Sequence, residues 1–130
     1  MKKQNKFIII ALSVFVIVGI LAFYSVSNNK KETNTLDDFA KCITNSGAKF
    51  YGAFWCSHCQ AQKNEFGSSK EFLPYVECSS ADAKSQTDVC KEAGVEAYPT
   101  WIFADGTKQL GEISFEELAE KTSCPLPSLE

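Results

Sequence analysis

The sequence has no excess of positive charge and contains a single histidine. Thirteen basic residues stand against sixteen acidic ones, which gives a formal net charge of -3 at pH 7 and a pI near 5.2. The lysines are scattered along the chain rather than gathered in one stretch. Proteins that bind nucleic acid usually present a basic surface to the phosphates. The sequence therefore predicts that nucleic acid is not a partner.

The chain also lacks internal repeats and low-complexity segments, and its 130 residues leave room for little more than one compact domain. Single domains commonly have about 100 to 150 residues. Six cysteines are many for a domain of this size. Because disulfides persist in oxidising compartments, they indicate that the domain lies outside the cytoplasm.

One long uncharged run is present, FIIIALSVFVIVGILAFYSV at residues 7–26. At about 1.5 Å per residue, such a helix matches a bilayer core of about 30 Å. The run predicts a single-pass transmembrane anchor. A cleaved signal peptide is the alternative, but its apolar region usually has only about 7 to 15 residues.

Lysines flank this run unequally, with three before it and two after it. Positive charge favours the cytoplasmic side of a membrane. The bias predicts that residues 1–6 are cytoplasmic and that the domain lies on the extracytoplasmic side of a bacterial cell envelope. Residues 27–35 are polar and aperiodic, which predicts a linker.

The folded domain is expected over residues 36–125, followed by a tail at 126–130. Apolar spacing, capping residues and glycine stops predict the order helix, strand, helix, strand, helix, strand, strand, helix. This order predicts an α/β fold with a central mixed sheet of about four strands and helices on both faces. Helix starts are expected at Thr35, Cys56, Ser85 and Ser114, strands within 48–55 and 74–78, and a hairpin turn at Asp105 and Gly106.

The stretch WCSHCQ, residues 55–60, carries the most specific chemical signal. Cys56 falls where a predicted strand meets a predicted helix, so N–H groups of the first turn favour its thiolate. His58 adds a donor, or a cation when it is protonated. Cys59 lies one turn further along and is expected to be more buried and less reactive. Cys56 is thus the predicted nucleophile, and Cys59 is the thiol that resolves the mixed disulfide.

Three other interpretations of the cysteine pair are weaker. A zinc site needs about four ligands, and Cys78 and Cys90 are too far apart to form a second ligand pair. Attachment of c-type haem needs a histidine after the second cysteine, where this chain has Gln60. A permanent structural disulfide is geometrically possible, but a reactive position at a helix start argues against it. No metal or cofactor is predicted.

Three stretches, YGAFWCSHCQAQK, PYVEC and AGVEAYPTW, together resemble a thioredoxin-fold domain. In particular, they resemble the thioredoxin-like partner of bacterial vitamin K epoxide reductase homologues, over about residues 36–125. The resemblance implies that Pro99 is cis and packs beside the cysteine pair; X-Pro bonds tolerate this isomer. It also implies that Trp55 and Tyr98 bind substrate, with the Tyr98 backbone offering an edge to an extended segment. Without the cysteine motif, Tyr98 and Pro99 would suggest only a turn at a strand entry.

One position departs from the family pattern. Thioredoxins and disulfide isomerases usually carry a buried Asp or Glu six residues before the first cysteine, and here that position is Phe50. The proton acceptor for Cys59 is therefore missing or supplied differently.

The remaining four cysteines cannot be paired from sequence alone, because six cysteines allow fifteen full pairings. Similar cysteines occur in the resembled group, which implies that Cys78 and Cys90 form one pair. This pair is either a staple contributing about 3 kcal/mol or a second redox pair that relays electrons. Cys42 and Cys124 would then tie together the ends of a small core.

These features predict a membrane-anchored thiol-disulfide oxidoreductase whose substrates are protein thiols or disulfides. Stabilisation of the reduced pair raises its potential, so His58 favours an oxidase. The resemblance implies reoxidation by a quinone-linked membrane partner like vitamin K epoxide reductase. The alternatives are an envelope disulfide isomerase or reductase, and a thioredoxin-fold binding module without turnover.

Overall fold

The computed structural model describes residues 15–20 and 35–128. The chain divides into two compact units, Met1–Glu32 and Thr33–Glu130. In the first unit, residues 15–20 are helical. No helix among the described residues is both long and apolar enough to cross a membrane. Most of the predicted anchor at 7–26 lies outside the described residues. So do residues 1–6, which were predicted to be cytoplasmic, and nearly all of the predicted linker at 27–35.

The second unit is built on a four-stranded mixed sheet with the strand order β2-β1-β3-β4. Strand β1 (Lys49–Gly52) pairs in parallel with β2 (Tyr75–Glu77) and antiparallel with β3 (Thr100–Ile102). Strand β4 (Lys108–Leu110) continues the sheet beyond β3 as a hairpin. The predicted mixed sheet and the predicted hairpin are confirmed.

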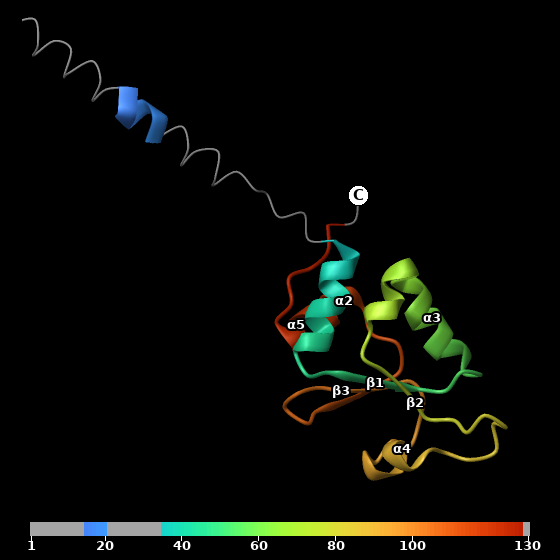
Figure 1. Ribbon diagram of the computed structural model, residues 1–130. Helices are drawn as coiled ribbons and strands as arrows, with labels where there is room; N and C mark the ends of the chain where they lie inside the picture. The colour runs from blue at the N-terminus through green and yellow to red at the C-terminus, as the bar shows by residue number, and fades with distance from the viewer. Residues whose placement is uncertain (1–14, 21–34, 129–130) are drawn as a thin grey trace, which may run out of the picture. The chain divides into compact units, whose positions relative to one another are not determined.

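Helices cover both faces of this sheet, as predicted (Figure 1). On one face, three α-helices pack over the larger core, and a 3-10 helix connects α3 to β2. On the other face, a short helix packs over a smaller core. The helices on the face of the larger core are α2 (Leu36–Asn45), α3 (Ser57–Glu65), α5 (Phe115–Thr122) and the 3-10 helix η1 (Gly67–Phe72). The short helix on the opposite face is α4 (Asp88–Glu92).

Alternation along the strands separates the two cores, because successive side chains of a strand point to opposite faces. Phe50 of β1 and Trp101 of β3 are fully buried in the larger core, where their rings stack with centroids 4.6 Å apart. Tyr51 and Ile102 pack instead against the smaller core. The central strands are thus covered on both sides, and the end of β1 leads directly to the cysteine motif.

Side-chain caps explain where the helices α2 and α5 begin. Thr35 caps α2 in a capping box with Asp38, and Ser114 caps α5 by accepting the N–H of Glu117. Both starts were predicted. The predicted start of α4 at Ser85 is wrong, since the N-cap is Thr87. The Ser85 N–H instead donates to the side chain of Ser80 within the preceding loop.

Two further local predictions need correction. The strand expected within residues 48–55 ends at Gly52, because the chain turns there and the Cys56 N–H donates to the Ala53 carbonyl. The 3-10 helix η1 was not predicted. Such helices are short and carry weak sequence signals.

Candidate redox-active site

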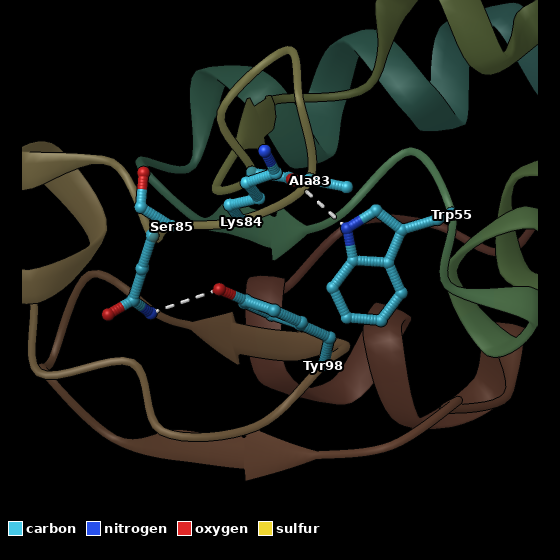
Figure 2. A pocket seen from close by; sticks show the side chains of 7 residues that line it. Trp55, Ala83, Lys84, Ser85 and Tyr98 are labelled. Atoms are coloured by element: carbon cyan, nitrogen blue, oxygen red, sulfur yellow. Dashed lines mark hydrogen bonds between the residues drawn. The ribbon is translucent and has the colours of Figure 1, made fainter.

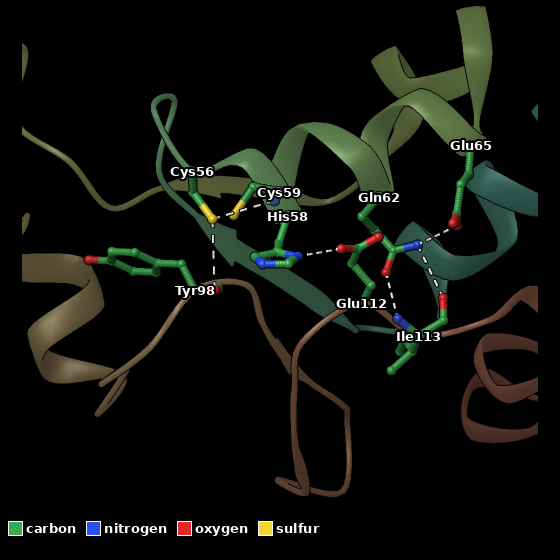
Figure 3. Close-up of polar contacts among 8 residues, drawn as sticks. All are labelled: Cys56, His58, Cys59, Gln62, Glu65, Tyr98, Glu112 and Ile113. Carbon is green, nitrogen blue, oxygen red and sulfur yellow. Dashed lines mark hydrogen bonds and ion pairs between the residues drawn. The ribbon is translucent and has the colours of Figure 1, made fainter.

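Cys56 is the N-cap residue of α3, and its sulfur accepts a hydrogen bond from the backbone N–H of Cys59 at 3.4 Å (Figure 3). Cys56 is 8% exposed, whereas Cys59 is fully buried. Both are free thiols. The structure therefore confirms the predicted placement of the pair at a helix start, with Cys56 slightly exposed and Cys59 fully buried.

The two thiols differ in acidity as well as in exposure. Burial, together with the hydrogen bond to Cys56, raises the pKa of the Cys59 thiol from 9.0 to about 12. Cys59 is consequently protonated at neutral pH in the reduced protein. A buried thiol with a high pKa is a poor first nucleophile, so an incoming disulfide meets Cys56 first.

The loop before β3 lies against the cysteine pair. The Cys56 thiol donates to the Tyr98 carbonyl with a sulfur-to-oxygen distance of 3.7 Å (Figure 3). The Tyr98–Pro99 peptide bond is cis, the isomer that the resemblance implies, and Pro99 is fully buried. The structure thus brings Pro99 and Tyr98 to the site even though they lie more than 40 residues away in sequence.

Trp55 and Tyr98 line an open pocket of about 210 Å³ (Figure 2). Their rings meet edge to face with centroids 5.9 Å apart, and Trp55 is 55% exposed. The Trp55 indole donates to Ser79, and the Gln86 amide donates to the Tyr98 hydroxyl. Both aromatic residues are therefore held at the surface near the reactive sulfur. Their contact with substrate stays a prediction.

The His58 ring lies between Cys56 and Glu112, a residue of the segment between β4 and α5 (Figure 3). Its Nδ1 lies 2.6 Å from a carboxylate oxygen of Glu112, while the His58 side chain is 71% exposed. An exposed ion pair contributes only about 0 to 1 kcal/mol to stability. The contact instead fixes the orientation of the imidazole beside the cysteine motif. Glu112 was not predicted, and no local motif marks it.

Gln62 joins the active-site helix to the same segment from inside the core. It is fully buried, its amide N–H donates to the Ile113 carbonyl and to Glu65, and its carbonyl accepts the Ile113 N–H (Figure 3). Burial, followed by repulsion from Glu112, raises the pKa of Glu65. Gln62 was also missed by the sequence analysis, although a polar residue on the buried side of a helix is a usable signal.

Two disulfides flank the site. Cys42 of α2 is bonded to Cys124 after α5, and Cys78 after β2 is bonded to Cys90 of α4. Cys78 and Cys90 are both fully buried in the smaller core. Burial suits a structural staple, since redox-active pairs are accessible to a partner thiol. A redox role for this second pair stays a prediction.

Within residues 15–20 and 35–128, no group of three or more His, Cys, Asp or Glu side chains is placed to hold a metal ion. The reactive groups that the structure brings together are the Cys56 and Cys59 thiols, with His58 and the Tyr98 carbonyl beside them. Such a pair can exchange disulfides by moving electrons between sulfur atoms.

Comparison with known proteins agrees with this geometry. The family model described as Thioredoxin matches residues 29–123. The chain belongs to the thioredoxin family. Together with the four-stranded sheet and its covering helices, this match confirms the predicted thioredoxin-like fold.

Several relatives of this thioredoxin-family chain have names that state an activity. "Thiol-disulfide oxidoreductase LTO1" of Arabidopsis thaliana is 48% identical over 92 residues, covering 67% of this chain and 24% of that protein. A protein disulfide-isomerase of Humicola insolens is 33% identical over 102 residues, covering 77% of this chain and 19% of that protein. The chain thus spans about a quarter or less of these relatives. Their names agree with the predicted class of enzyme.

Proposed function

We propose that this chain is a membrane-anchored, extracytoplasmic thiol-disulfide oxidoreductase that oxidises protein thiols through Cys56 and Cys59. The observation that carries the proposal is the position of Cys56, which caps α3 above the buried Cys59 and beside the Tyr98 carbonyl. Membership of the thioredoxin family and the names of the relatives support it.

Oxidation begins with the Cys56–Cys59 disulfide. A substrate thiolate attacks the Cys56 sulfur, the bond between the cysteines breaks, and Cys59 leaves with the bonding electrons and takes up a proton. The second substrate thiolate then attacks the substrate sulfur of this mixed disulfide and displaces Cys56 as a thiolate. The substrate gains a disulfide and loses two electrons, which the reduced cysteine pair now holds.

His58 and the helix start favour the oxidising direction. A thiolate at Cys56 lies at the amino terminus of α3, where it accepts the Cys59 N–H. Glu112 holds the His58 ring on the first turn of the same helix, and the imidazole adds positive charge there whenever it is protonated. Both effects stabilise the reduced pair, and each 1.4 kcal/mol of such stabilisation raises the potential by about 30 mV.

For reoxidation, we propose a quinone-linked membrane protein like vitamin K epoxide reductase. The resemblance carried by residues 51–63 and by the segments around Cys78 and Pro99 supports this partner. The proposed anchor at residues 7–26 would hold both proteins in one membrane and raise their effective concentration.

A disulfide isomerase is the second candidate, and the name of the Humicola insolens relative favours it. Isomerisation uses the reduced pair: the Cys56 thiolate attacks a wrong disulfide of the client, which then rearranges. The two candidates use the same cysteines and differ in the redox state that the cell maintains.

A Cys59→Ser variant is expected to trap the partners of Cys56. Without Cys59, a mixed disulfide on Cys56 has no internal thiol to resolve it. The full chain, produced in membranes of a cell that contains the proposed partner, should accumulate adducts that dissociate on reduction. These are separated by non-reducing electrophoresis and identified by mass spectrometry.

The double variant Cys56→Ser/Cys59→Ser serves as the control for this trapping experiment. The proposed function predicts secreted clients and a quinone-linked membrane protein in the single variant and neither in the control. Equal adducts in both variants would refute the role of Cys56. Adducts with clients alone would refute the proposed membrane partner.

A further inference from the structure

The site lacks the buried acid that family members usually place near the second cysteine, yet Cys59 still has to form a thiolate. Phe50 occupies that position and is fully buried against Trp101. Burial raises the pKa of the Cys59 thiol to about 12. The protonated thiol is a poor nucleophile, and a thiolate of high pKa is a poor leaving group. A positive charge near Cys59 would therefore favour its thiolate and speed exchange.

Gly52 of β1 shows what lies next to the Cys59 sulfur. A Cβ atom placed on Gly52 would be 2.8 Å from the sulfur of Cys59 and 2.9 Å from Cε2 of Tyr75. The sulfur and the edge of the tyrosine ring therefore approach the same point on the sheet. Because any side chain at Gly52 would collide with both, the missing Cβ is what allows this approach.

Lys63 lies over the ring of this tyrosine. Its Nζ lies 3.1 Å from the centroid of the Tyr75 ring, and Lys63 follows Cys59 by one turn of α3. The ammonium group, the aromatic ring and the sulfur therefore form one contiguous cluster. The positive charge of Lys63 acts on Cys59 in the direction that lowers the pKa of the thiol.

Glu77 completes the cluster as a fixed anion. One carboxylate oxygen accepts the Tyr75 hydroxyl at 2.9 Å, and the other accepts the backbone N–H groups of Ser79 at 2.9 Å and Phe54 at 3.2 Å. Burial lowers the pKa of Lys63, and the Glu77 charge opposes this effect most strongly. Glu77 thus helps to keep Lys63 charged in a partly buried position.

We propose that Lys63, held over the Tyr75 ring and kept charged by Glu77, is a positioning residue that stabilises the Cys59 thiolate during exchange. This inference rests on the proposed function, because a thiolate at Cys59 matters only if Cys59 leaves and attacks. When a substrate thiolate breaks the Cys56–Cys59 bond, Cys59 departs with the electron pair beside the ammonium. It then takes a proton from water, and Lys63 remains charged throughout.

The reactivities of Cys56 and Cys59 can be measured separately with an aromatic disulfide reagent, 5,5′-dithiobis(2-nitrobenzoate), because the reaction has two phases. In the reduced soluble domain, residues 33–130, Cys56 attacks the reagent first and releases one coloured thiolate. Cys59 then attacks the mixed disulfide on Cys56 and releases the second. The unit Thr33–Glu130 has its own sheet and cores, so it is suitable for this assay. The first phase reports on Cys56 and the second on Cys59.

Replacement Lys63→Met is expected to slow the second phase and leave the first unchanged. A rise of one pKa unit cuts the thiolate fraction about tenfold, while the thiolate becomes more nucleophilic, so the net fall is about threefold. The fall should persist from neutral pH to about pH 9. Lys63→Arg should restore the rate because it keeps the charge.

Lys41→Met is the matched control, since Lys41 also lies over an aromatic ring, 4.1 Å from the centroid of Phe72, on α2. It should change neither phase. An unchanged second phase in Lys63→Met, or a fall that Lys63→Arg does not restore, would overturn the role of Lys63. If Lys63→Met lowers the melting temperature, Lys63→Gln is measured in the same way. Loss of the first phase in the unsubstituted domain would instead refute Cys56 as the nucleophile and, with it, the proposed function.

Discussion

Replacement of Cys56 by serine is expected to abolish thiol-disulfide exchange while leaving the fold intact. Serine cannot form the mixed disulfide, so no step of the proposed reaction can begin. At the same time, serine is a good N-cap residue, and its oxygen can accept the Cys59 N–H that the sulfur now accepts. The loss should therefore be chemical rather than structural.

The measurement for this variant is the rate at which the oxidised protein forms a disulfide in a reduced dithiol peptide, with far-UV circular dichroism to verify folding. A rate indistinguishable from the uncatalysed reaction is expected for Cys56→Ser. The double variant Cys78→Ala/Cys90→Ala is the control, because both residues are buried in the smaller core. It should retain the activity at temperatures where it remains folded.

Two results would contradict this account. A Cys56→Ser protein that still oxidises the peptide would exclude Cys56 as the reactive sulfur. A loss confined to the folded Cys78→Ala/Cys90→Ala protein would identify the second disulfide as the redox pair. If Cys56→Ser instead retains client binding and the unsubstituted protein shows no turnover, the non-catalytic binding module is the better description.

Removal of the Cys42–Cys124 disulfide should cause a large loss of stability. The bond joins residues separated by 82 positions and ties α2 to the chain after α5. In the chain-entropy model, a cross-link that closes a loop of this length lowers the entropy of the unfolded chain and stabilises the folded state by about 4 to 5 kcal/mol. The domain is small, so a staple that joins its ends contributes a large share of its stability.

The double variant Cys42→Ala/Cys124→Ala is therefore expected to lower the free energy of unfolding by about 3 to 5 kcal/mol. The free energy is measured by urea unfolding, followed by circular dichroism. The double alanine variant at Cys78 and Cys90, whose bond spans only 12 positions, should lose less, about 3 kcal/mol. A loss below about 1 kcal/mol at Cys42 and Cys124 would contradict the entropic argument.

Local signals in the sequence were sufficient for the elements that carry the site. Thr35 and Ser114 cap helices as predicted because their side chains bond to N–H groups only three residues away. Cys56 behaves similarly at the start of α3. Where two residues offered the same local signal, the prediction failed: Ser85 and Thr87 are both good caps, and the loop uses Ser85 for its own hydrogen bonds.

The contacts that shape the site across the fold could not be predicted in the same way. Glu112 meets His58 across 54 positions, and Gln62 holds Ile113 across 51. Neither contact has a local signature, because each depends on how the segment before α5 returns to the helix that follows Cys56. The same is true of Lys63, Tyr75 and Glu77, which come together only after β2 pairs with β1.

The most direct test of the central proposal is the reduction potential of the Cys56–Cys59 pair. The soluble domain is equilibrated in glutathione buffers, and its thiols are trapped and counted by mass spectrometry. Stabilisation of the reduced pair by the α3 amino terminus and by His58 predicts a value above about -200 mV, in the range of oxidases and isomerases. A value below about -250 mV would contradict the account and make the protein a reductant like thioredoxin, whose potential is about -270 mV.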